Sequence, residues 1–423
     1  MVGRTSRSLF SKLNHSEGPA ILVRDFIRDA LYHPSHGYFS SKSEAIGFLP
    51  EPISFSKLKG RRHYMQRLSD LYKESDVSWF TPVELFKPWY GYALANYILK
   101  NYNSKFPLQI FEIGGGTGTC AKNILDYLKI QGPVVYDKMK YISIEISRAL
   151  ANAQLKTVHS ERMHKSHFSV ECRDACSQEG WGKVDENPCF VIMLEVLDNQ
   201  PHDLIYKVNS SFPWLETRLL KRPESEVLVE IHKPVEDPWI QRCIKILEHE
   251  KPELTSWLAS MKKFFHKGFR VSRKAWIPTG CMQLLEGLYT SHPNLSLIIC
   301  DFNILPDVQV PGERAPLVAK KKDGVTVDLS SYLDVKGDAD IFFPTDFQLL
   351  RQIDRHCYSS ARANMQIHDD FSRAQRQSLI VPVSEFMKKY ADFSKTQTMD
   401  GFNPLLDDYS NMQFFLSKYF YNS

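Results

Sequence analysis

Between residues 108 and 197, short apolar runs alternate with helical patterns, and this order constrains the fold of the chain more than any other feature. The helical patterns TCAKNILDYLKI and SRALANAQLKTV separate the runs LQIFEI, KYISIEI and HFSVECRDA, and the apolar run PCFVIMLEVL follows. Strands that alternate with helices form parallel sheets whose two faces are covered by the helices. The sequence therefore predicts an α/β protein with a doubly wound, Rossmann-like sheet.

The turn after the first run contains Gly114, Gly116 and Gly118, and Glu112 lies just before it. Glycine permits positive φ and leaves no Cβ between a ligand and the backbone N–H groups at a helix start. GTGTCA fits the dinucleotide pattern GxGxxA, which holds a pyrophosphate. An acid beside a pyrophosphate would repel it, whereas Glu112 could take the ammonium group of S-adenosylmethionine. We expect these four residues to bind S-adenosylmethionine.

Acids also end the second and third runs. Glu145 could accept hydrogen bonds from both ribose hydroxyls, as acids also do in NAD enzymes, so this residue does not discriminate between the cofactors. Asp174 lies where adenosylmethionine enzymes place an acid against the adenine amino group, an element rare in NAD enzymes. Its alternative role is to cap the next helix.

The fourth run leads into LEVLDNQP, which contains Glu195 and Asp198. Ligands of open parallel sheets bind beyond the carboxyl ends of the strands. Two carboxylates there would suit a cation, and a guanidinium group fits best because it is planar and offers a fork of donors. They could orient its nitrogen toward a methyl donor and assist proton loss. Alternatively, Asp198 belongs to a turn before Pro201 and Glu195 lies at the surface.

The sequence predicts that the whole chain is divided into four parts. Residues 1–16 are basic and serine-rich without an acid, which is typical of a mitochondrial transit segment. Residues 17–80 form an N-terminal helical region. Residues 81–350 form the catalytic domain, with a charge-rich helical insertion at about 214–275, and residues 351–423 form a C-terminal helical extension.

Composition excludes several classes. The 53 basic and 49 acidic residues give a net charge of +4, too balanced for nucleic acid as the main partner. No apolar run approaches the roughly 18–20 residues that cross a bilayer, so we expect no transmembrane segment. The eight cysteines are scattered, which indicates buried free thiols in a reducing compartment. Cys172 and Cys176 could form a metal site, but no second pair supports it, so we expect no metal.

Several motifs together resemble the MidA-type family, the mitochondrial protein arginine methyltransferases known as complex I assembly factor 7. VRDFIRDALYHPSHGYF, FTPVELF, FEIGGGTGT, LEVLDNQP and GDADIFFPTDF are similar to its successive signatures, over about residues 20–350. The resemblance carries Glu195, Asp198 and Asp340 across. The sequence departs from the family at Leu194, where the family often has asparagine, and at Asn303, where it has glycine.

The resemblance implies a seven-stranded methyltransferase sheet and symmetric arginine dimethylation of a subunit of respiratory complex I, in the mitochondrial matrix. The expected partner is this protein substrate, and a homodimer is left open. Three alternatives remain from the residues. The chain could be a catalytically silent assembly scaffold, a nucleic-acid methyltransferase, which the near-neutral charge disfavours, or a NAD-dependent dehydrogenase, which Glu112 and Asp174 disfavour.

Overall fold

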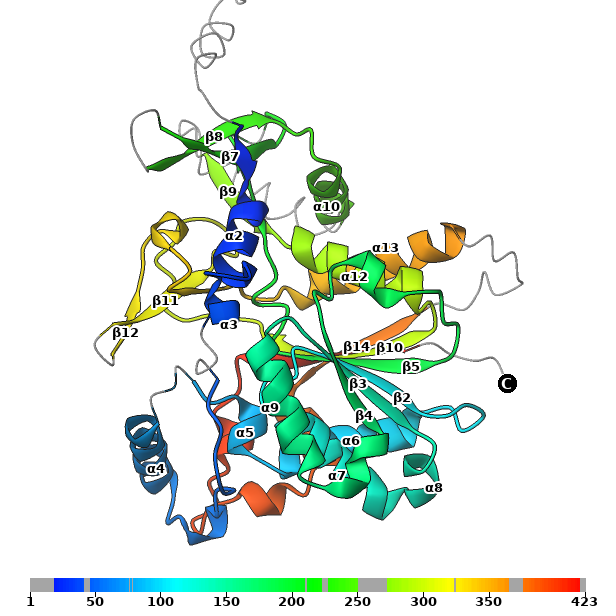
Figure 1. Cartoon of the computed structure of the whole chain (residues 1–423). Helices are drawn as coiled ribbons and strands as arrows, with labels where there is room; N and C mark the ends of the chain where they lie inside the picture. Colours follow the sequence, from blue (N-terminus) through cyan, green and yellow to red (C-terminus); the bar gives the residue numbers. More distant parts are fainter. Residues whose placement is uncertain are drawn as a thin grey trace, which may run out of the picture.

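A mixed seven-stranded sheet forms the centre of the protein (Figure 1). The computed structural model describes residues 19–41, 46–75, 77, 79–209, 211–222, 227–249, 272–322, 325–364 and 376–418. The predicted transit segment, residues 1–16, lies outside them. The sheet has the order β14-β15-β10-β5-β2-β3-β4 and consists of β2 (Gln109–Ile113), β3 (Lys140–Glu145), β4 (Phe168–Cys172), β5 (Cys189–Leu194), β10 (Leu295–Phe302), β14 (Gln377–Pro382) and β15 (Met412–Lys418).

Five neighbouring strands of this sheet are parallel, as predicted, and β15 is antiparallel to both β10 and β14. The chain runs from β2 outward to β3 and β4, and then returns to place β5 on the other side of β2. This reversal opens a crevice between the carboxyl ends of β2 and β5, where open α/β sheets bind their ligands. The predicted seven-stranded fold is confirmed. The prediction for residues 351–423 was wrong in part, because β14 and β15 complete the sheet.

Helices cover both faces of the sheet, each over its own hydrophobic core (Figure 1). Side chains of Ile110, Ile192 and Ile298 point to one face and those of Phe111, Val191 and Ile299 to the other, as the two-residue period of a strand requires. The first face packs against α6 (Trp89–Asn101), α7 (Thr119–Gln131) and α14 (Val383–Tyr390), with α9 (Arg148–His159) beside α7. The second packs against α10 (Pro238–His249), α12 (Thr279–Ser291) and α13 (Phe347–Asn364).

Short helices connect these parts. Helix α5 (Pro82–Leu85) precedes α6, and Pro88 lies between them. The hydroxyl of Thr81 accepts the N–H of Glu84, so Thr81 is the N-cap of α5. Two further short helices are α8 (Pro133–Tyr136) and α15 (Pro404–Asp407).

A second, antiparallel sheet lies beside the first, at the top of Figure 1. It consists of β1 (Ile21–Leu22), β6 (Asp203–Lys207), β7 (Leu215–Lys221), β8 (Leu228–Pro234) and β9 (Arg273–Ile277). The prediction of a helical insertion at 214–275 was therefore wrong for its strands, and only α10 is helical among its described residues. The charges of β7 misled the prediction because they are paired within the fold. Glu216, fully buried, accepts bonds from Arg218 and from the N–H groups of Glu236 and Asp237.

The N-terminal region, residues 17–80, contains β1 together with α2 (Val23–Tyr32), α3 (Tyr38–Ser41) and α4 (Arg61–Glu74). Buried Arg24 fixes α2 by donating to Asp203 at 2.6 Å and to Asp237 at 2.5 Å. A three-stranded sheet lies next to α2 and consists of β11 (Leu317–Lys322), β12 (Val325–Asp328) and β13 (Asp340–Phe342). Among the described residues, every helix is too short or too polar to span a membrane.

Candidate active site

Two adjoining pockets open at the carboxyl ends of β2, β3 and β5. The first has about 790 Å³ of empty space and extends over the ends of β3 and β4, between the glycine loop and α2. The second has about 1140 Å³ and extends toward α5 and β13. Both pockets share the lining residues Phe39, Ile46, Gly114, Gly116, Glu195 and Asn199. A ligand in the first pocket would therefore meet a ligand in the second beside Glu195.

The glycine loop forms the boundary between the two pockets. Gly114 and Gly116 have φ values of +68° and +53°, a region that side chains with a Cβ rarely adopt. A Cβ on Gly116 would contact only Ile46, at 3.8 Å, so it would occupy pocket space rather than packed protein. These two glycines line both pockets, so a ligand there could approach their backbone, and their role in donor binding stays a prediction.

Gly118 has a different surrounding from the other two glycines. It lines neither pocket, has a φ of +84° and caps α7, and a Cβ there would lie 2.8 Å from the Cα of Gln154 on α9. The requirement for glycine at this position is therefore the close packing of α7 against α9. The expectation that Gly118 makes room for the donor is not what its contacts support.

Glu145 lies at the end of β3 and lines the first pocket. One carboxylate oxygen accepts the N–H of Ser147 at 2.9 Å and the other accepts the amide of Gln154 at 3.0 Å. Burial raises the pKa of Glu145 to about 7. Each oxygen keeps a second lone pair, so the carboxylate could accept hydroxyl groups of a ligand without losing its own support.

Asp174 follows β4 and lines the same pocket, next to Ala175. Its carboxylate accepts the N–H of Cys176 at 2.8 Å, which closes a local turn. The next helical turn begins only at Gln178, so Asp174 does not occupy its N-cap position. Asp174 thus supports a turn and faces the pocket at once.

Glu112 lies beneath the glycine loop and lines the second pocket rather than the first. It is 3% exposed and accepts the hydroxyl of Tyr141 at 2.9 Å. Burial raises its pKa to about 7. The carboxyl of Glu112 therefore lies in the second pocket, beside Gly115 of the glycine loop, and its role in donor binding stays a prediction.

Glu195 follows β5 and lines both pockets, in a strained backbone conformation. Its φ is +54°, which costs roughly 1–2 kcal/mol for a residue with a Cβ. Its N–H donates to the carbonyl of Cys300 on β10 at 2.9 Å, which holds this conformation. Burial, and then the nearby Asp198, raise the pKa of Glu195 to about 8. Such strain is common where a side chain must be directed into a site.

Asp198 is buried, and its Oδ1 has no hydrogen-bond partner. Burial raises its pKa to about 7. Its own backbone is held by Asp301, whose Oδ2 accepts the N–H groups of Leu197 at 3.0 Å and of Asp198 at 3.1 Å. An unpartnered carboxyl oxygen in a pocket is a vacant acceptor for a ligand that donates hydrogen bonds.

Glu84 and Asp340 also line the second pocket, and Tyr32 lines the first. Asp340 accepts the side chain of Asn199 at 2.8 Å, and the phenol of Tyr32 donates to the carbonyl of Asn199 at 3.0 Å. Glu84 faces the second pocket from α5 and forms an ion pair of 2.5 Å with Lys87. All three residues lie within the family motifs, and the resemblance carried Asp340 across, but no pattern distinguished Glu84 or Tyr32 from their neighbours.

The second pocket is acidic. Its described lining residues include five carboxyl side chains and no lysine, arginine or histidine. The acids are Glu84, Glu112, Glu195, Asp198 and Asp340. Among the described residues, only Glu84 of these five forms an ion pair, and burial raises the pKa of each of the other four. A cation bound among them would favour their ionised forms and relieve the unfavourable burial.

A comparison with solved structures finds the same fold in two bacterial proteins. A protein from Burkholderia thailandensis, crystallised with S-adenosyl-homocysteine, superposes with a TM-score of 0.60 at 13% identity, over 97% of this chain and 90% of that one. A second crystal structure from the same organism gives a TM-score of 0.52 at 13% identity, over 97% and 89% of the two chains.

The chain belongs to a family of S-adenosyl-L-methionine-dependent methyltransferases, whose model matches residues 93–365. The curated protein arginine methyltransferase NDUFAF7 homolog, mitochondrial, of Schizosaccharomyces pombe is 22% identical over 361 residues, 79% of this chain and 75% of that protein. The family expected from the motifs is confirmed, and the cofactor of the family is S-adenosylmethionine. The first pocket fits this ligand, with open space at Gly116 and two acids at strand ends.

Proposed function

We propose that this protein is a protein-arginine N-methyltransferase that dimethylates an arginine symmetrically on a complex I subunit in the mitochondrial matrix. Two similarities support the biological setting. The motifs resemble those of complex I assembly factor 7, and the relative from Schizosaccharomyces pombe carries both "protein arginine methyltransferase" and "mitochondrial" in its name. The proposed substrate group, a guanidinium, is supported by the residues that line the second pocket.

The observation that carries the proposal is the acidic second pocket. It adjoins the first pocket, here called the donor pocket, at Glu195. Guanidinium is permanently charged, planar and rich in donors, so several carboxylates can bind it at once. Aromatic side chains complete the walls and suit the flat faces of the group. They are Phe39, Trp79, Phe80, Phe302, Phe342 and Tyr409.

The residues can perform the reaction in the following way. S-adenosylmethionine held in the first pocket would supply the methyl group of its sulfonium to a guanidinium nitrogen, with S-adenosylhomocysteine as the leaving group. Asp198, with its vacant Oδ1, would hold the guanidinium and fix one nitrogen toward the donor pocket. Glu195 borders both pockets and would accept the proton that the methylated nitrogen loses. The raised pKa of its carboxyl, about 8, suits a group that takes up a proton near neutral pH.

Complementation of a knockout cell line tests whether the protein acts in complex I assembly through methyl transfer. Cells that lack the protein would receive the native chain, Glu145→Ala or Glu195→Gln, and complex I assembly and methylarginine would be measured together. We expect assembly and symmetric dimethylarginine to return only with the native chain. Full assembly with both variants would favour the alternative, a scaffold that retains the cofactor fold and does not use catalysis.

A further inference from the structure

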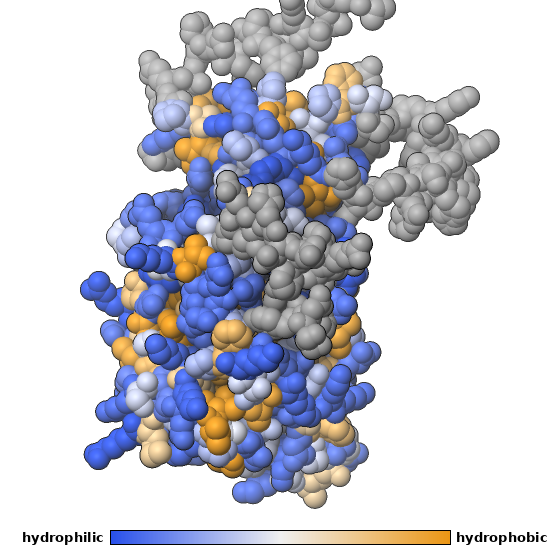
Figure 2. Space-filling view, turned by 90° about the vertical axis from the view of Figure 1, so that its right-hand side faces the viewer, coloured by the Kyte–Doolittle hydropathy of each residue, from blue (hydrophilic) through white to orange (hydrophobic). Residues whose placement is uncertain are grey.

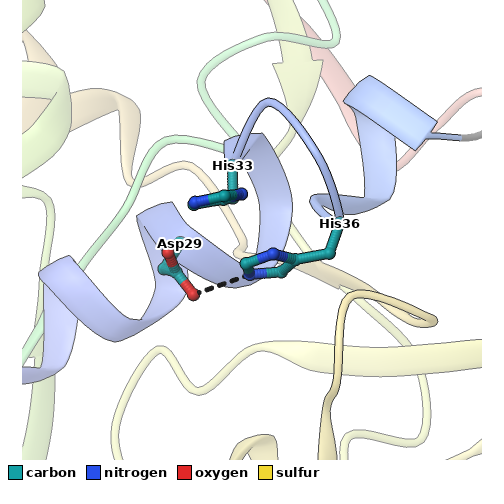
Figure 3. Close-up of side chains that lie close together, drawn as sticks. All are labelled: Asp29, His33 and His36. Carbon is teal, nitrogen blue, oxygen red and sulfur yellow. Dashed lines mark hydrogen bonds and ion pairs between the residues drawn. The ribbon is translucent and has the colours of Figure 1, made fainter.

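Three side chains with metal-binding atoms gather where α2 ends, outside both pockets (Figure 3). One ligand atom from each of Asp29, His33 and His36 lies within 4.8 Å of the others. In the described part of the chain, no other group of three or more histidine, cysteine or acidic side chains meets this criterion. The methyltransferase chemistry uses none of the three.

The local sequence dictates this arrangement. Asp29 and His33 are four residues apart, so they lie on the same face of the last helical turn. The helix ends before Pro34, and Gly37 then donates its N–H to the carbonyl of His33 at 2.8 Å. A Cβ on Gly37 would lie 2.4 Å from the backbone nitrogen of His33, so only glycine permits so tight a turn.

The tight turn brings His36 back over the helix end. Its Nε2 lies 3.0 Å from Oδ2 of Asp29, and its ring stacks on that of His33 with centroids 3.8 Å apart and planes at 19°. Figure 3 shows both imidazoles directed to the same side as the carboxylate. The side chains of Asp29 and His36 are 57% and 49% exposed, so an ion could reach the cluster and keep water as further ligands.

The chemistry of the set suits a divalent transition metal. Two imidazoles and one carboxylate are ligands for Zn²⁺ and its neighbours in the first transition row. The C-terminal end of a helix carries partial negative charge, which also favours a cation there. Nδ1 of His33 and of His36 lie 3.0 Å and 3.3 Å from the hydroxyl of Ser35. Donation from Nδ1 to this oxygen would leave both Nε2 atoms free to bind metal, and would replace the contact between Nδ1 of His33 and the N–H of Ser35.

We propose that Asp29, His33 and His36 form a surface site for one Zn²⁺ ion, which fixes the turn between α2 and α3. The inner side of this turn faces the donor pocket. Tyr32 and Phe39 line that pocket, and their rings stack with centroids 5.7 Å apart. An ion that holds the turn would therefore strengthen donor binding, because less of the pocket wall has to be ordered when the donor binds.

Calorimetric titration of the tag-free, metal-stripped full chain with ZnCl₂ tests the site, and Co²⁺ absorption reports the ligand type. The variants are His36→Ala and Asp29→Asn. Two controls match them: His63→Ala removes an exposed histidine of α4, and Cys172→Ser removes the exposed thiol. Circular dichroism without metal would check that every variant is folded, which the exposure of the altered side chains favours.

We expect one saturable Zn²⁺ site that both variants weaken by roughly tenfold or more and that both controls retain. S-adenosylmethionine affinity should rise with Zn²⁺ in the native chain and not in His36→Ala. Zn²⁺ binding that survives both variants, that Cys172→Ser removes, or that does not saturate at micromolar metal would overturn the proposal. Unchanged donor affinity alongside normal Zn²⁺ binding would overturn only the coupling to the pocket.

Discussion

Replacing Glu195 by glutamine should make the stability of the protein less sensitive to alkaline pH. Burial, and then Asp198, raise the pKa of this carboxyl from 4.5 to about 8. A carboxyl whose pKa is higher in the folded state binds more protons there than in the unfolded chain. Its contribution to the free energy of unfolding is fully present below pH 4.5 and is lost as the pH rises toward about 8. Glutamine has no titrating proton, so the variant escapes this loss.

The pKa difference sets the size of the effect. One pKa unit corresponds to about 1.4 kcal/mol. Between about pH 6 and about pH 9, the native protein should therefore lose about 2–3 kcal/mol of unfolding free energy relative to Glu195→Gln. Because Glu195 borders two open pockets, water reduces this difference, and we expect the lower end of that range.

Urea denaturation followed by tryptophan fluorescence at both pH values measures the effect. The buried acids Glu112 and Glu145 titrate in both proteins, so their contributions cancel in the comparison. Glu51→Gln, which changes an exposed side chain, should behave like the native protein. Parallel pH dependence of the native protein and Glu195→Gln would refute the inference that the fold raises the pKa of Glu195.

Three further predictions concern donor binding, packing and catalysis. Glu145→Ala should weaken S-adenosylmethionine binding by roughly tenfold to a hundredfold, because it removes a charged hydrogen-bond acceptor; unaltered calorimetric affinity would contradict this role. Gly118→Ala should lower the melting temperature more than Gly116→Ala, because both have positive φ but only the former meets the backbone of Gln154. Gly116→Ala should instead lower donor affinity, and equal effects of the two variants on both quantities would contradict the distinction. The kcat/KM for an arginine peptide should rise with pH through about 7 and about 8 and then level off, as Asp198 and Glu195 ionise and bind the guanidinium; a flat profile would count against their role.

The central strands and the donor loop could be predicted because their signals are local. LQIFEIGGGTGT places a strand, a turn and a helix start within twelve residues, and the observed β2, glycine loop and α7 follow that order. The acids at strand ends then had to converge, since parallel strands end at the same edge of the sheet. The positive φ of Glu195 and the packing role of Gly118 were not predictable, because each depends on a neighbouring strand or helix.

The missed features depend on partners far away in the chain. Asn199 and Asp340 are 141 residues apart, so no local pattern could show that they hold each other. Strand β15 inserts between β10 and β14, and its own sequence does not specify that position. The strands β7 and β8 were predicted as helical because they are rich in charge. Their charges are satisfied by partners such as Arg218 with Glu216, which only the fold reveals.

Methyl transfer to arginine in vitro tests the central claim most directly. The purified protein would be incubated with methyl-labelled S-adenosylmethionine and complex I assembly intermediates, with Glu195→Gln as the matched variant. Labelled products would be located by mass spectrometry. The account predicts symmetric dimethylarginine on one complex I subunit, formed by the native chain and lost with Glu195→Gln. Donor binding without transfer, or label on another residue type or on nucleic acid, would contradict it.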